Sequence, residues 1–182
     1  MKEKANKLQD TIDKKMLEER TIFLWGQVDD KSAKYIVDRL MYLDMLNHDE
    51  IKFYINSPGG YVTSGFSIFD TMKMIKSPVS TICSGLAASM GSVLLCYGEK
   101  GRRFIQPHAK VMIHQPLGGA QGQASNIEIQ ASEILKTKEL IANILAENCG
   151  QDMEKVMKDF NRDYWMDAKE SLDYGIVDGI LE

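Results

Sequence analysis

Hydrophobic positions recur along the chain with two different periods, and these periods predict the order of its elements. Short runs of apolar and β-branched residues indicate buried strands, whereas apolar residues spaced three or four positions apart among charges indicate amphipathic helices. The expected strands cover residues 21–25, 51–56, 79–83 and 110–115. The expected helices cover residues 6–19, 30–47, 62–76, 87–96, 125–148, 152–160 and 167–174.

The alternation of strands and helices predicts the fold class. Strands that are separated by helices form βαβ units, in which right-handed crossovers place the helices on the faces of a parallel sheet. No internal repeat, linker or low-complexity tract interrupts the pattern. We therefore expect an α/β fold with one domain over residues 20–182, preceded by an amphipathic helical segment over residues 1–19.

Turn and capping residues mark the ends of several predicted helices. Pro78 follows the helix 62–76, and Gly150 and Gly175 close two later helices. Asp30 is expected to cap the helix that it begins. The sequence from Ser125 to Glu128 matches a capping box and is expected to open the long helix to about residue 148.

Composition and charge exclude several classes of protein. The 182 residues are 44% hydrophobic and 26% charged, as in ordinary globular proteins, and the net charge is −4. Basic residues form no dense patch, so we expect no nucleic-acid partner. Residues 77–98 carry no charge, but their five serines, three glycines and one proline make them unsuited to a membrane. No apolar stretch of a signal peptide follows Met1, and we expect a cytoplasmic protein.

The cysteines predict neither a disulfide framework nor a metal site. Cys83, Cys96 and Cys149 are odd in number and show no C-x-x-C spacing. Buried, reduced thiols are the simplest interpretation. We expect no metal and no cofactor in this chain.

Ser89 is the candidate nucleophile. It lies in Ala87-Ala88-Ser89-Met90-Gly91, which directly follows a predicted strand and opens a predicted helix. Small neighbours allow a sharp turn that presents the hydroxyl, and the free N–H groups of a helix start can stabilise a developing oxyanion. The same spacing also occurs by chance where a helix start is tightly packed, so the motif alone leaves both interpretations open.

A second strand end carries the sequence Asn56-Ser57-Pro58-Gly59-Gly60. Adjacent glycines leave backbone N–H groups unshielded by Cβ atoms, so that a substrate carbonyl can approach them closely. An ordinary strand-to-helix turn would have the same composition. Because the carboxyl ends of strands in open α/β sheets face one crevice, two such sites together favour a binding site there.

His114 is the candidate general base. It ends a predicted apolar strand, whereas His48 and His108 lie in segments that we expect to be exposed. A neutral imidazole near Ser89 would accept the hydroxyl proton and later donate it to the leaving amine. A structural histidine is the alternative. The carboxylate that would orient His114 is not identified by local pattern.

Five motifs in order resemble one family, the proteolytic subunit of the ATP-dependent Clp protease, over about residues 20–181. The motifs are Tyr54-Ile55-Asn56-Ser57-Pro58-Gly59-Gly60, Gly85-Leu86-Ala87-Ala88-Ser89-Met90-Gly91-Ser92, Met112-Ile113-His114-Gln115-Pro116 with its glycine-rich extension 118–123, Arg162-Asp163, and Tyr174-Gly175-Ile176-Val177-Asp178. The resemblance implies a crotonase-like α/β fold and a serine endopeptidase.

The resemblance also implies roles for individual residues. Ser89, His114 and Asp163 would form the catalytic triad, and the backbone N–H groups of Gly60 and Met90 would form the oxyanion hole. Residues 117–123, among them Gly118, Gly119 and Gln123, would pair with the substrate backbone. Together with the helix 125–148, they would form the handle, about residues 116–150, which joins two rings. Arg162 would also contact the opposing ring.

The family implies partners as well. Its members stack two seven-membered rings around the active sites and receive unfolded polypeptides from a hexameric AAA+ ATPase, which alone uses ATP. Three features differ from the usual pattern: residues 1–19 read as a charged helix in place of a pore hairpin, Lys52 replaces a common tyrosine, and Asn161 replaces an acid. They favour a paralogue that works beside a second proteolytic subunit.

Two other functions compete with a fully active peptidase. A weakly active or structural subunit of a mixed assembly would share the fold, but the presence of Ser89, His114 and Asp163 argues against a loss of chemistry. A crotonase-type acyl-CoA lyase would share the fold and the glycine loop. That chemistry rarely needs a Ser-His pair, so peptidolysis is favoured.

Overall fold

The computed structural model describes the backbone of residues 2–181 and the side chains of residues 7–181. Within these residues, seven strands form one sheet: β1 (Thr21–Trp25), β2 (Ile51–Ser57), β3 (Val79–Ala88), β4 (Arg103–Ile105), β5 (Lys110–Ile113), β6 (Tyr164–Met166) and β7 (Gly179–Ile180). The helices are α1 (Lys2–Glu18), α2 (Asp30–Leu46), α3 (Val62–Met74), α4 (Met90–Cys96), α5 (Ala124–Cys149), α6 (Met153–Asp159) and α7 (Ala168–Tyr174).

The sheet is mainly parallel and runs in the order β1-β2-β3-β4-β7. The long strand β3 has two neighbours on its outer side. Residues 81–83 pair with β4, and residues 86–88 pair with β5, which in turn pairs antiparallel with β6. The end of β3 therefore lies between β2 and β5, and the segments that follow these three strands meet at one end of the sheet.

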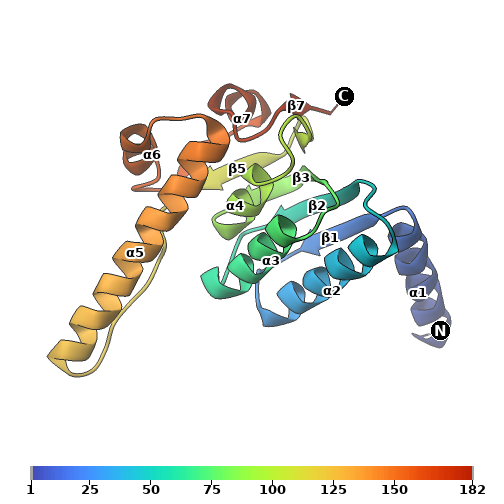
Figure 1. The fold of residues 1–182 in the computed structure, drawn as a ribbon, viewed down its shortest axis with the longest axis horizontal. Coiled ribbons are helices and arrows are strands. Elements are labelled where there is room, and N and C mark those ends of the chain that lie inside the picture. The colour runs from blue at the N-terminus through green and yellow to red at the C-terminus, as the bar shows by residue number, and fades with distance from the viewer. Residues whose placement is uncertain (1, 182) are drawn as a thin grey trace.

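Helices α2, α3 and α4 cover one face of the sheet (Figure 1). The core between the two layers is made of aliphatic and aromatic side chains that are nearly or fully buried, among them Ile36, Leu40, Phe53, Ile55 and Leu94. Removal of this apolar surface from water is the main favourable contribution to folding. The predicted α/β architecture is confirmed.

The end of β3 differs from the prediction. We expected the strand to stop at residue 83 and a helix to begin at residue 87, but the strand continues to Ala88 and α4 begins at Met90. Gly85, with φ +88°, introduces an irregularity and does not end the strand. The pairing of residues 86–88 with β5 holds the backbone extended up to Ser89, and a single-strand pattern cannot show such pairing.

Two predicted caps were also wrong. The cap of α2 is Asp29, whose carboxylate accepts from Ser32 N in a reciprocal capping box, and Asp30 is the first helical residue. Helix α5 begins at Ala124 without a side-chain cap, so Ser125 lies within its first turn. The left-handed glycines that end α5 and α7, Gly150 and Gly175, are confirmed.

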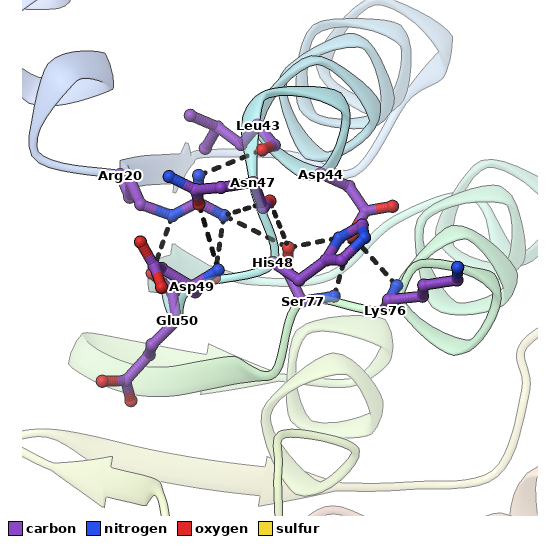
Figure 2. Close-up of polar contacts among 9 residues, drawn as sticks. All are labelled: Arg20, Leu43, Asp44, Asn47, His48, Asp49, Glu50, Lys76 and Ser77. Atoms are coloured by element: carbon purple, nitrogen blue, oxygen red, sulfur yellow. Dashed lines mark hydrogen bonds and ion pairs between the residues drawn. The ribbon is translucent and has the colours of Figure 1, made fainter.

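Arg20 joins α1 to β1 and fastens the end of the sheet that lies away from Ser89. Its guanidinium donates hydrogen bonds to several backbone carbonyls at and beyond the end of α2, and Figure 2 shows how these converge on it. Nearby, Asp44 accepts hydrogen bonds from the N–H groups of Lys76 and Ser77. Arg20 thus fixes the segment before β2, and Asp44 fixes the segment before β3. The carbonyls that Arg20 contacts belong to Leu43, Asn47, Asp49 and Glu50.

Helix α5 projects from the body, and the segment after β5 runs along it (Figure 1). A Cβ atom on Gly118 would lie 2.7 Å from Cδ1 of Ile134, which shows how closely the segment approaches the helix. Leu117, Ile129 and Leu135 on this projection are 84%, 62% and 63% exposed. Within the described residues, no helix has the length and apolar character that a bilayer crossing requires.

Candidate active site

Ser89 occupies the strained turn between β3 and α4. Its φ of 54° and ψ of −123° lie in a region that residues with a side chain rarely adopt. The turn is held on both sides, because Ser89 N donates to Met112 O at 2.9 Å and Ser89 O accepts from Ser92 Oγ at 2.6 Å. This is the geometry of a nucleophile elbow, which presents the hydroxyl at the end of the sheet.

Among the backbone N–H groups near Ser89, those of Gly60 and Met90 have no acceptor in the described residues. Met90 is the first residue of α4, where N–H groups lack partners within the helix. The Gly60 loop is fixed from its other side, since Val28 N donates to Gly59 O and Tyr61 N donates to Val28 O. Such free and positioned donors can bind an oxyanion.

Gly60 has no room for a side chain. Its φ is +155°, and a Cβ atom there would lie 2.1 Å from Val28 O. Any other residue would displace the loop and its N–H group. The sequence reading identified the unshielded amides, whereas the part played by Val28 was missed because it lies about thirty residues away in the chain.

His114 and Asp163 are brought together by the pairing of β5 with β6. The antiparallel register places Ile113 opposite Tyr164, so the residue after β5 faces the residue before β6. His114 Nδ1 lies 3.1 Å from Oδ1 of Asp163. An Nδ1–H donated to this carboxylate leaves Nε2 as the free nitrogen, the tautomer that a general base needs.

Two other aspartates of the C-terminal segment, Asp167 and Asp178, are engaged elsewhere. Asp167 caps α7 by accepting from Glu170 N. Asp178 accepts from Nε of the buried Arg103 at 2.8 Å. Burial alone would raise the pKa of Asp178, but hydrogen bonds from the Arg103 side chain and backbone lower it on balance. Of these three aspartates, only Asp163 contacts His114.

One cavity of about 220 Å³ contains Ser89 and His114 in its wall, together with Gly60 and Met90. No hydrogen bond joins Ser89 to His114 in the part of the chain that the structure describes. The rest of the wall is apolar, with residues drawn from α3, α4, α5 and two loops. These residues are Pro58, Val62, Val93, Pro116, Leu117 and Ile141.

The comparison with known families accounts for this arrangement. The family model for Clp protease matches residues 3–182, essentially the whole chain. The chain belongs to the Clp protease family. Its fold is accordingly the crotonase-like α/β fold, and its class of activity is peptide-bond hydrolysis. The resemblance inferred from five sequence motifs is thus confirmed.

The residues expected to contact substrate or a second ring lie on the projection and beside it. Gly118, Gly119 and Gln123 are exposed, and their segment forms no strand within the described chain. Arg162 is exposed, and its neighbour Asn161 accepts hydrogen bonds from Gln115 Nε2 through its backbone carbonyl at 2.9 Å and its Oδ1 at 3.3 Å. Their roles in the Clp handle remain predictions, since strand pairing there requires a second chain.

Proposed function

We propose that this member of the Clp family is a serine endopeptidase subunit in which Ser89 is the nucleophile, His114 the base and Asp163 the orienting carboxylate. The contact of 3.1 Å between His114 and Asp163, beside a strained serine in one cavity, is the observation that carries the proposal. The free N–H groups of Gly60 and Met90 lie at the same cavity and supply the oxyanion hole.

The reaction follows from these positions. His114 Nε2 accepts the Ser89 proton as Oγ attacks the scissile carbonyl, and the oxygen that becomes negative binds the two N–H groups. The imidazolium, stabilised by Asp163, returns the proton to the leaving amine and leaves an acyl-enzyme. A water molecule, deprotonated by His114, then releases the carboxylic acid and regenerates Ser89.

The serine and the histidine must approach each other before this chemistry begins. Catalytic hydrogen bonds are often long or poorly aligned in a free enzyme and tighten when substrate binds. Asp163 is 62% exposed at its side chain and His114 only 14%, so the carboxylate side of the pair is the open one. Cover from a neighbouring subunit or substrate would strengthen the His114–Asp163 interaction by excluding water.

Assembly into stacked seven-membered rings is part of the proposal. Apolar side chains on the projecting handle support it, because exposed leucines and isoleucines that gather on one arm mark an interaction surface. A groove of about 640 Å³ between α1, β1 and α2 has Ile12, Met16, Phe23 and Trp25 in its walls and supports a second contact. Unfolded polypeptide would be delivered by an AAA+ ATPase, while this chain would use neither ATP nor any other cofactor.

A weakly active subunit that depends on a paralogue is the second candidate. The exposed Lys52 and the replacement of an acid by Asn161, whose side chain contacts Gln115 of its own chain, favour it. A crotonase-type acyl-CoA lyase is less well supported. Lyase chemistry does not need a histidine held by a carboxylate beside a strained serine.

A fluorophosphonate probe tests the proposal. We expect it to label the wild-type chain at Ser89 and to leave Ser89→Ala unlabelled, because only an activated hydroxyl reacts. Ser89→Ala should also lower peptide hydrolysis by about 10⁴- to 10⁶-fold. Ser80→Ala, which removes a buried hydroxyl at the far end of β3, is the control and should label normally. Normal peptide turnover by Ser89→Ala would refute the assignment.

A further inference from the structure

Ser57, the last residue of β2, is fully buried between the two loops that carry the free N–H groups. Its hydroxyl oxygen accepts a hydrogen bond from Gly59 N at 3.0 Å. On its other side it packs against the first turn of α4, where a Cβ atom on Gly91 would lie 3.3 Å from Ser57 Cβ. Ser57 thus contacts a neighbour of each proposed oxyanion donor, Gly59 beside Gly60 and Gly91 beside Met90, and is not part of the cavity wall.

The hydrogen bond to Gly59 helps to fix where the next N–H group points. Gly59 is buried, and its carbonyl is already fixed by Val28 N at 2.9 Å. With the Gly59 N–H fixed by Ser57 as well, the peptide groups on both sides of Gly59 are held. The peptide that carries the Gly60 N–H therefore has little freedom to rotate, and this N–H remains available at the cavity.

The same loop is in direct contact with the nucleophile. A Cβ atom on Gly59 would lie 2.6 Å from Ser89 Cβ and 2.8 Å from Met90 N. Any rotation of the Gly59 peptide would change the distance between the two oxyanion donors. Preorganised donors lower the barrier because they need no rearrangement when charge develops, so a small displacement is costly in rate.

We infer that Ser57 is a positioning residue that holds the Gly60 N–H at the oxyanion hole through the Gly59 N–H. This inference rests on the proposed serine-peptidase function. Ser57 acts through Gly59, so its loss should affect the stabilisation of the transition state more than the binding of substrate.

The test compares Ser57→Ala and Ser57→Cys with wild type in the assembled enzyme. Alanine removes the acceptor, and cysteine keeps the size of the side chain but supplies only a weak acceptor. We expect both to lower kcat by about ten- to a hundredfold, less than the loss of a direct oxyanion donor, with KM changed less than about threefold. The affinity for a peptide aldehyde, whose hemiacetal oxygen occupies the oxyanion hole, should fall in proportion to kcat/KM.

The control is Ser80→Ala. Ser80 is also buried, its Oγ donates one hydrogen bond to Arg102 O at 2.9 Å, and it lies on β3 at the other end of the sheet. A purely structural loss would lower the melting temperature in all three variants and leave kcat and aldehyde affinity of the assembled fraction unchanged. Unchanged kcat in either assembled Ser57 variant overturns the inference.

These experiments distinguish an error in the proposed function from an error in this inference. If Ser89→Ala keeps wild-type turnover, the peptidase mechanism is wrong whatever Ser57 does. If Ser89→Ala is inactive and assembled Ser57→Ala or Ser57→Cys is as fast as wild type, only the role of Ser57 is wrong. If Ser57→Ala fails to assemble, kcat and the aldehyde affinity of the nearly isosteric Ser57→Cys test the inference instead.

Discussion

Gly59 and Ser89 are in contact, although they follow different strands: a Cβ atom on Gly59 would lie 2.6 Å from Cβ of Ser89. The loop after β2 and the turn after β3 are therefore packed as one unit. Any side chain at residue 59 must displace the serine turn, the loop, or both.

Gly59→Ala should abolish peptide hydrolysis and lower stability. The added methyl would also meet Ala88 O at 2.7 Å, and the φ of +86° is unfavourable for alanine. Gly101→Ala is a matched control, because Gly101 has a similar φ of +83° but nothing within 4 Å of its Cβ position. Turnover of a fluorogenic peptide and thermal unfolding measure both effects. Equal losses in the two variants would mean that backbone strain alone, and not contact with Ser89, is responsible.

Asp163→Asn should lower kcat strongly, yet less than Ser89→Ala does. An asparagine can still contact His114, but it cannot stabilise the imidazolium and can favour the wrong tautomer. Asp167→Asn should leave kcat within about twofold, because Asp167 caps α7 and asparagine is an equally good N-cap. Steady-state kinetics of the two variants measure their effects on kcat. A silent Asp163→Asn together with a damaging Asp167→Asn would show that the wrong carboxylate had been chosen.

Asp178→Asn should destabilise the chain near neutral pH, by about 3 kcal/mol, because it leaves the buried Arg103 without its counter-charge. Burial raises the pKa of Asp178, but the hydrogen bonds and the positive charge of Arg103 together lower it in the folded chain. Its contribution is therefore complete above the unfolded pKa of about 4 and is lost as the pH falls through the lower folded pKa.

Denaturant unfolding at pH 7 and near pH 3 measures this dependence. The difference in unfolding free energy between wild type and Asp178→Asn should narrow at the lower pH. Protonation then makes the wild-type side chain neutral, as the asparagine already is. Asp173→Asn, an exposed aspartate one helix earlier, should show a small gap at both values. A gap that widens on acidification would contradict the lowered pKa.

Arg20→Lys should lower stability by about 2 kcal/mol, because one ammonium group cannot replace a guanidinium that donates to four carbonyls and to Ser77 Oγ (Figure 2). Arg39→Lys is the comparison, since Arg39 is only partly buried, donates one hydrogen bond, to Tyr35 O, and lies over the ring of that tyrosine. Thermal unfolding of both variants gives the measurement. Equal effects would show that the convergence of carbonyls on Arg20 adds nothing.

The isolated chain should form double rings poorly and should gain activity from a second proteolytic subunit. In the proposed ring, Lys52 would place a hydrated ammonium in the pocket that receives the ATPase, and Asn161 could not supply the charge that Arg162 of an opposing ring would meet. Asn161→Glu should therefore shift the sedimentation profile toward larger species. A double ring of wild-type chain that degrades protein with an ATPase, in the absence of any sibling subunit, would overturn this expectation.

Much of the fold was predictable because its long elements have clear periods. The α2 and α3 helices and the β1 and β2 strands lie within a few residues of the predicted ranges. The strands β4, β6 and β7 were missed, since two or three residues show no period. Their existence depends on pairing partners far along the chain, and local pattern carries no information on these partners.

The site was predictable in its residue types but not in its contacts. Ser89, His114 and the two glycines follow strands, so their convergence could be expected from the topology of a parallel sheet. Asp163 could not be selected locally, because it faces His114 only through the short β5–β6 pairing. Ser57 was part of a quoted motif, but its hydrogen bond to Gly59 becomes visible only when the loop conformation is known.

The distance in sequence between His114 and Asp163, 49 residues, also orders events during synthesis. The elbow at Ser89 and the glycine loop leave the ribosome first, and the histidine follows. The carboxylate comes only after the whole of α5 and α6 has been made. A nascent chain that has not yet released residue 163 therefore holds a serine and an imidazole without their orienting partner. The His114–Asp163 contact therefore forms late in synthesis, after the strands that carry the serine and the histidine.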